Sequence, residues 1–165
     1  MESATLELRL LGEPALIREG KACPLPASRK TRALLVYLAT TRRPQRRDPL
    51  CSMLWVLPDD PRGALRWSLS KLRGLVDDPD RPRLVADGEN VSLDLDGVAV
   101  DLDGLRACAQ ADVGAGTSEP EEQWFNPFCD GLELARCDEF QSWFAAEREN
   151  VRLLQIALLR RLPDR

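Results

Sequence analysis

Hydrophobic and charged positions alternate with a period of two over residues 5–11, near the start of the chain. This alternation predicts a β-strand with one buried and one exposed face. Gly12 and Gly20 then separate two more short extended stretches, at residues 15–17 and 22–25. We therefore expect a small antiparallel sheet at the N-terminus.

Two helices are predicted after this sheet. Ser28 is a suitable N-cap for a first helix, which has a broad apolar stripe and runs to about Thr41. Asp48 followed by a proline predicts the start of a second, short helix that ends near Trp55. The polar residues 42–47 are expected to form a linker between the two helices.

The third predicted helix, residues 62–76, has two faces of different chemistry. It begins after an Asp-Pro signal and ends at an Asp-Asp-Pro sequence, residues 77–79. At about 100° per residue, four apolar residues form one narrow stripe for the core: Leu65, Leu69, Leu72 and Val76. The other side offers cations, a hydroxyl and an aromatic ring: Trp67, Ser70 and Lys71 opposite the stripe, with Arg62, Arg66 and Arg73 on one flank. Such a face is typical of a helix that reads a DNA groove.

Residues 81–86 and 90–95 alternate in polarity on either side of Asp87 and Gly88, which is a strong hairpin signal. Strands, three helices and a terminal hairpin describe a winged helix-turn-helix. In that fold the third helix enters the major groove, and the hairpin, or wing, touches the DNA backbone or minor groove.

The C-terminal part is predicted to be helical. Apolar residues recur at helical spacing for about 25 residues from Asp138, and we expect the aromatic members Phe140, Trp143 and Phe144 to pack in the core. The predicted fold class is mainly α with small β-sheets. We place a winged-helix domain at residues 1–100 and the start of a helical domain at residues 101–165.

The net charge of -4 conceals a strong asymmetry. Residues 1–83 carry 16 basic and 10 acidic side chains, whereas residues 84–165 carry 7 basic and 17 acidic ones. Residues 18–73 carry 13 basic and 4 acidic side chains. This local excess of positive charge favours a polyanionic partner, above all double-stranded DNA. The alternative is a solvated basic surface without a partner. The acidic half should repel DNA and stay available to a protein partner.

Several classes of function are excluded by composition. The chain has no histidine, which rules out Ser-His, Cys-His and His-metal sites. Its five cysteines contain no C-x-x-C pair, and buried or idle thiols are the expectation. No apolar run reaches membrane-span length and no signal-peptide pattern is present, so we expect a cytoplasmic protein with no membrane contact. We expect no catalytic activity, no metal and no cofactor.

Several short segments match a known family in both residues and order: 10–12 (LLG), 30–38 (KTRALLVYL), 47–50 (RDPL), 54–55 (LW), 64–73 (ALRWSLSKLR), 101–105 (DLDGL), 131–134 (GLEL), 140–144 (FQSWF) and 147–148 (ER). These segments resemble the Streptomyces antibiotic regulatory protein family. Its members join an OmpR-type winged helix to a bacterial transcriptional activator domain of TPR-like helices. Because family activator domains continue through further helices, the resemblance implies that this chain is a truncated part of a longer regulator.

Three groups of residues are candidates for DNA contact. The first lies on the third helix (Arg62, Arg66, Trp67, Ser70, Lys71, Arg73), the second in the linker (Arg42, Arg43, Arg46, Arg47) and the third on the wing (Arg81, Arg83). The resemblance also allows the linker arginines to face RNA polymerase. Two alternatives stay open: the helix cations form only a solvated face, and Trp67 packs against the wing or the C-terminal helices.

The sequence thus predicts a sequence-specific DNA-binding transcriptional regulator, an activator that contacts RNA polymerase or, on tandem sites, a second protomer of a homodimer. Two other functions remain. One is a winged helix used only for protein contacts, and the other is the N-terminal regulatory part of a larger signalling ATPase or cyclase.

Overall fold

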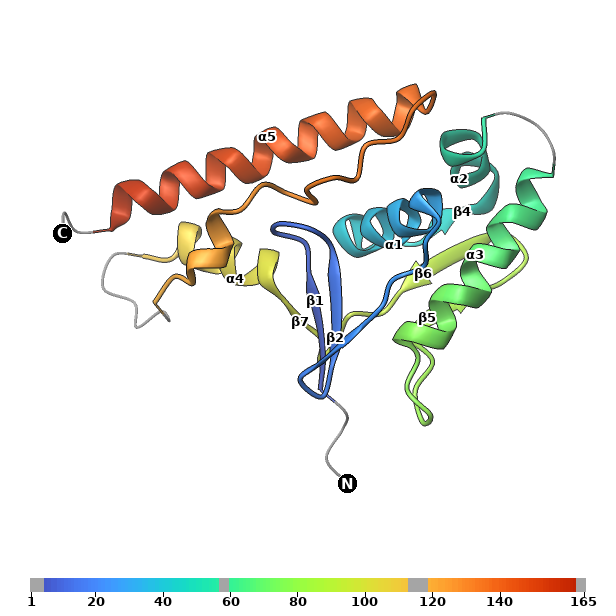
Figure 1. The fold of residues 1–165 in the computed structure, drawn as a ribbon, viewed down its shortest axis with the longest axis horizontal. Helices are drawn as coiled ribbons and strands as arrows, with labels where there is room; N and C mark the ends of the chain where they lie inside the picture. Colours follow the sequence, from blue (N-terminus) through green and yellow to red (C-terminus); the bar gives the residue numbers. More distant parts are fainter. Residues whose placement is uncertain (1–4, 57–59, 113–118, 163–165) are drawn as a thin grey trace.

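The computed structural model describes residues 5–56, 60–112 and 119–162 and is mainly helical, with two small sheets (Figure 1). The elements run in the order β1 (Leu6–Arg9), β2 (Ala15–Arg18), β3 (Lys21–Cys23), α1 (Arg29–Thr41), β4 (Gln45–Arg46), α2 (Arg47–Leu54), α3 (Pro61–Val76), β5 (Leu84–Ala86), β6 (Asn90–Leu93), β7 (Ala99–Val100), α4 (Asp101–Gln110), η1 (Glu122–Phe125) and α5 (Asp138–Arg161). The predicted fold class is confirmed: a winged helix-turn-helix is followed by a helical segment.

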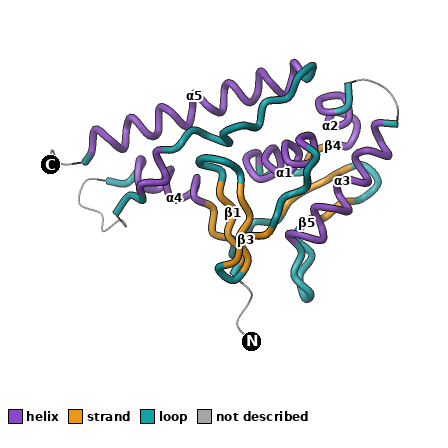
Figure 2. The backbone as a smooth tube through the Cα atoms, in the orientation of Figure 1, coloured by secondary structure: helices purple, strands orange, loops and turns teal. Residues whose placement is uncertain are grey.

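The N-terminal sheet has the strand order β3-β2-β1-β7. Strands β1, β2 and β3 form the predicted antiparallel sheet, with Leu6, Leu8 and Leu16 on the buried side. Strand β7 adds a parallel edge to β1, which the sequence analysis did not predict. Figure 2 shows how the loop after this sheet leads directly into the helices.

Helix α1 begins and packs as predicted. The Ser28 hydroxyl accepts a hydrogen bond from the Thr31 amide at 3.2 Å, which caps the helix. The hydroxyls of Thr31 and Ser68 lie 2.8 Å apart between α1 and α3, and both residues are buried. This hydrogen bond satisfies two polar groups inside the core and fixes how α1 and α3 lie against each other.

The start of helix α2 differs from the prediction. The N-cap is Arg46, without a side-chain hydrogen bond, and Asp48 lies inside the first turn. A carboxylate there interacts favourably with the helix dipole without capping it. The preceding residues are also not a free linker, because β4 pairs with β6 in a second sheet of order β4-β6-β5. Strands β5 and β6 form the predicted wing.

The C-terminal part packs against the open end of the N-terminal sheet. The carboxylate of Asp101, at the start of α4, accepts hydrogen bonds from the amides of Leu10 and Leu11 at 2.8 and 3.0 Å. The following chain returns to the same place, where the Cys129 amide donates to the Leu10 carbonyl at 2.7 Å. Burial raises the pKa of Asp101, and the amides that donate to its carboxylate oppose that shift.

Helix α5 confirms the predicted amphipathic helix. Phe140 and Phe144 are buried, and the ring of Trp143 packs against Tyr37 of α1 with 4.8 Å between ring centroids. A single cluster of buried side chains runs through the winged helix and the helical segment. The division at residue 100 stays a prediction. Among the described helices, none combines the length and apolar character of a membrane span.

A close approach at Gly104 generates the first testable prediction. A Cβ atom at this position of α4 would lie 2.6 Å from the ring of buried Trp124, closer than any normal contact. Replacement of Gly104 by Ala should therefore lower the free energy of unfolding by about 1 to 3 kcal/mol, through overpacking. Urea denaturation followed by circular dichroism measures this change.

Gly74 is the matched control, because it also lies in a helix but has nothing within 4 Å of an added Cβ. Gly74→Ala should raise the free energy of unfolding by about 0.5 to 1 kcal/mol, through helix propensity alone. Equal effects of the two substitutions would contradict the packing described at Gly104.

Candidate nucleic-acid interface

Helix α3 presents most of the selected side chains on its exposed side. The Asp60 carboxylate accepts a hydrogen bond from the Gly63 amide at 2.9 Å, and Pro61 occupies the first turn. The predicted apolar stripe is buried, together with Ser68. The exposed residues are Arg62, Arg66, Trp67, Ser70 and Lys71, with Arg73 half-buried on the flank.

Trp67 is the most unusual of these residues, because 52% of its surface is exposed to solvent. This exposure does not fit the alternative in which the indole packs against the wing or the C-terminal helices. The ammonium group of Lys71 lies 5.5 Å from the centre of the Trp67 ring, one helical turn away. The two side chains therefore form a cation–π pair at the middle of the exposed face.

The arginines of α3 are weakly engaged within the protein. Arg62 pairs with Asp48 at 2.7 Å, but both side chains are more than 70% exposed. An ion pair of this kind contributes little to stability and exchanges readily with another anion. In the part of the chain that the structure describes, the guanidinium groups of Arg66 and Arg73 have no hydrogen-bond or ion-pair partner. All three cations are thus available to a ligand.

The four linker arginines are divided between different surroundings. Arg42 pairs with Asp103 of α4 at 2.7 Å, while Arg43 and Arg46 are exposed. The Arg47 guanidinium donates to the Asp87 carbonyl at 2.8 Å, and its amide donates to the Glu89 carbonyl at the same distance. The start of α2 is therefore tied to the wing turn, so Arg46 and Arg47 lie beside the wing.

The two wing arginines differ in burial. Arg83 is only 4% exposed, and its guanidinium contacts Asp78 at 3.1 Å. A buried guanidinium that is paired with an aspartate cannot reach DNA, so the expectation of DNA contact for Arg83 is corrected here. Arg81 is half-buried and pairs with Asp94 at 2.8 Å, so much of its positive charge is balanced within the protein.

The wing turn itself carries negative charge. Asp87 and Glu89 are both exposed, and one Asp87 oxygen accepts hydrogen bonds from the amides of Asn90 and Glu89 at 2.7 and 2.8 Å. These two amides hold the pKa of Asp87 below its usual range, so the carboxylate is charged at neutral pH. Contact between the tip of the wing and a phosphate is therefore disfavoured.

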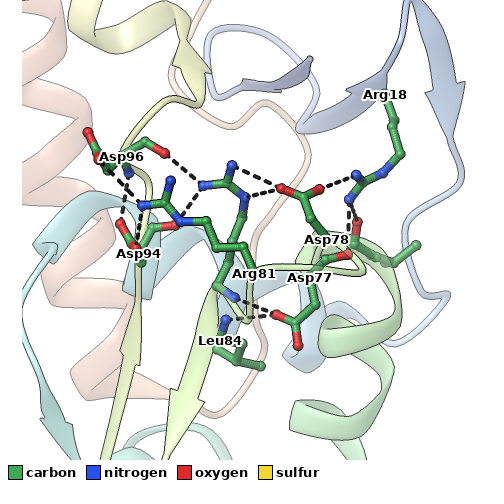
Figure 3. A network of polar contacts seen from close by, with 9 residues as sticks. Arg18, Asp77, Asp78, Arg81, Leu84, Asp94 and Asp96 are labelled. Atoms are coloured by element: carbon green, nitrogen blue, oxygen red, sulfur yellow. Dashed lines mark hydrogen bonds and ion pairs between the residues drawn. The ribbon is translucent and has the colours of Figure 1, made fainter. Parts of the chain in front are cut away.

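A polar network joins the end of α3 to the wing and to the N-terminal sheet (Figure 3). One oxygen of Asp78 contacts Arg18 of β2 at 2.5 Å, and the other accepts from Arg83 at 3.2 Å. The carboxylate of the preceding residue, Asp77, accepts from the amides of Arg83 and Leu84 at 2.8 and 2.9 Å. Two consecutive aspartates thus fix where the wing begins.

This network was not predicted from the sequence. Residues 77–79 were interpreted only as a helix terminator, and Arg18 was given no role. The available signal was a pair of carboxylates directly after the basic helix and before two arginines. That pattern does not reveal which arginine turns inward, since the partner on β2 lies 60 residues away.

The cysteines give no sign of reactive chemistry. Cys51, Cys108, Cys129 and Cys137 are buried, and burial raises the pKa values of the Cys51 and Cys129 thiols. Thiols of this kind are mostly protonated at neutral pH and react slowly. Within the described residues, no group of three acidic, cysteine or histidine side chains could hold a metal ion.

The chain is similar to a solved structure of Mycobacterium tuberculosis EmbR in complex with a low-affinity phosphopeptide. The TM-score is 0.70, the sequence identity is 24%, and the alignment covers 96% of this chain and 46% of the EmbR chain. The two proteins share this fold. The chain therefore spans less than half the length of EmbR. Models of protein families give no match, and neither do curated proteins.

The Asp78 network generates a prediction about stability and pH. Asp78→Asn should lower the free energy of unfolding at neutral pH by about 3 to 5 kcal/mol, because Arg83 stays buried without its countercharge. The hydrogen bond from Arg18 and the nearby charge of Arg83 lower the pKa of Asp78 in the folded protein. Its contribution is therefore complete above the unfolded-state pKa of about 3.9 and is lost as the pH falls through the lower folded-state pKa.

Urea denaturation of both proteins at about pH 7 and about pH 3 tests this prediction, and the difference between them should shrink at the lower pH. Asp96→Asn is the control, because its carboxylate is 86% exposed and lies 3.4 Å from Arg81. That change should cost less than about 0.5 kcal/mol. A difference for Asp78→Asn that does not change with pH would contradict the prediction.

Proposed function

We propose that this chain is the DNA-binding part of a transcriptional regulator and reads double-stranded DNA with helix α3. The observation that carries the proposal is the exposed face of α3, where Trp67, Ser70 and Lys71 lie opposite a fully buried apolar stripe. In a winged helix, the corresponding face of the third helix enters the major groove. Lys71 there suits a guanine edge, and the indole of Trp67 suits apolar contact with a thymine methyl group.

The arginines of the linker and those that flank the exposed face of α3 also support DNA contact. Arg46 and Arg47 lie beside the wing, and Arg62, Arg66 and Arg73 flank the reading face. In our proposal these arginines, with Arg43, contact phosphates and supply affinity, whereas the centre of α3 supplies specificity. Arg42 and Arg81 can contact phosphates only when their ion pairs with aspartates of this chain are broken.

The acidic C-terminal half supports a protein partner. Residues 84–165 carry ten more acidic than basic side chains, which opposes contact with DNA. Together with the resemblance to the Streptomyces antibiotic regulatory proteins, this charge supports an activator that contacts RNA polymerase or a second protomer through its helical segment. With such a partner, we propose that the protein acts in the cytoplasm.

Selection from random duplexes tests the proposal most directly. The wild-type chain should enrich a defined sequence, and its affinity for that duplex and for a scrambled one should fall with increasing salt. A winged helix that makes only protein contacts would show no enrichment and no salt-dependent binding, which would overturn the proposal.

Lys71 and Arg73 should differ when each is replaced by alanine. Lys71→Ala should cost about 1 to 3 kcal/mol on the selected duplex and relax base preference, since the side chain faces the groove. Arg73→Ala should weaken binding to selected and scrambled duplexes almost equally and lower the salt slope by roughly one, as expected for a phosphate contact. Binding titrations at several salt concentrations measure both effects.

Arg152 provides the control, because it lies on α5, away from α3 (Figure 1), and pairs only with Glu149 among the described residues. Arg152→Ala should leave both affinities unchanged. Our orientation of α3 is wrong if Lys71→Ala keeps the preference for the selected sequence while Arg73→Ala abolishes it.

A further inference from the structure

Arg18 occupies an unusual position for a cation on a small sheet. It lies at the end of β2, and its guanidinium turns toward the C-terminal end of α3, as Figure 3 shows. One of its nitrogens donates to the Leu75 carbonyl at 2.8 Å, and the other contacts Asp78 at 2.5 Å. One side chain thus holds both the last turn of α3 and the residues that follow it.

Asp78 also connects Arg18 to the wing. Its second oxygen accepts from Arg83, whose guanidinium also donates to the Asp96 carbonyl at 2.8 Å, just beyond the second wing strand. The N-terminal sheet, α3 and both ends of the wing therefore meet at Arg18, Asp78 and Arg83. The geometry of the DNA-facing surface depends on this junction.

Arg18 holds α3 near Leu75, several residues away from Trp67 and Lys71. A small rotation of the helix at this point therefore moves the exposed face by a larger distance. Lys71 and Trp67 precede Leu75 by four and eight residues, which is about 6 and 12 Å along the helix. A rotation of α3 by about 10° about its C-terminal end would then displace the two side chains by about 1 and 2 Å. Functional groups must be held to within about 0.5 Å to work, so a loss of this attachment would impair base contacts.

We propose that Arg18 is a positioning residue for DNA reading, which fixes α3 relative to the sheet and the wing and so sets sequence discrimination without touching DNA. The inference rests on the proposed function, since it requires α3 to read DNA. Removal of Arg18 leaves Asp78 paired with Arg83, so the wing keeps its attachment to the end of α3 and the domain should still fold.

The test compares wild-type protein with Arg18→Gln and Arg18→Lys on the selected duplex and on its scrambled counterpart, at several salt concentrations. Both variants should lose about tenfold or more in the ratio of the two affinities, which is the discrimination carried by one good base contact. The salt slope on the scrambled duplex should not change, because a lost phosphate contact would lower it by about 0.9. Lysine keeps the charge but lacks the fork that reaches both acceptors.

Arg9→Gln is the matched control. Arg9 lies on the adjacent strand β1 and pairs with Glu7 at 3.0 Å near the surface, so this change removes the same charge from the same sheet. It should leave the affinity ratio unchanged. Circular dichroism and thermal melting establish that each variant is folded at the temperature of the titrations.

An unchanged ratio in folded Arg18→Gln would overturn the inference, and so would a fall in the salt slope, which would make Arg18 a phosphate contact. Should Arg18→Gln fail to fold, Arg18→Lys decides by the same ratio. Absence of any enriched sequence with wild-type protein is a separate outcome, and it would overturn the proposed function together with this inference.

Discussion

The two ion pairs of the half-buried Asp78 carboxylate, with Arg18 and Arg83, are the interaction on which the rest of the winged helix depends. A buried charge such as the Arg83 guanidinium is stable only when it is paired and hydrogen-bonded, and Asp78 meets this need while it binds one arginine with each carboxylate oxygen. Because the two arginines come from the N-terminal sheet and from the wing, a single charge requirement fixes three parts of the molecule. These ion pairs therefore set the orientation of the exposed face of α3.

The exposed surface shows a matching division of charge. Cations and an aromatic ring gather on α3, whereas the turn of the wing carries Asp87 and Glu89. In the proposed complex the wing therefore contributes through its packing against α3 and through the base of its strands more than through its tip. Arg47 links the wing turn to α2, because it is hydrogen-bonded to the turn and is the first residue of that helix.

The elements predicted correctly are those with local signals. The stripe of Leu65, Leu69 and Leu72 follows helical periodicity, Ser28 is a common N-cap, and Asp87 with Gly88 is a strong hairpin turn. Strands β4 and β7 were missed because each has two residues, too few for any periodicity, and because their partners are distant in sequence. Arg83 was predicted to be exposed because the alternation of the strand does not reveal that Asp78 lies close enough to pair with a buried guanidinium.

Strand β1 illustrates how chain order and spatial order differ in this protein. One edge of β1 pairs with β2 within a few residues, but its other edge pairs with Ala99–Val100. The amides of Leu10 and Leu11 likewise find their acceptor only at Asp101. During synthesis, β1 leaves the ribosome long before β7 and Asp101, so it completes its hydrogen bonds only after all three helices of the winged helix have emerged. A nascent chain shorter than this point exposes an open strand edge, a known starting point for aggregation.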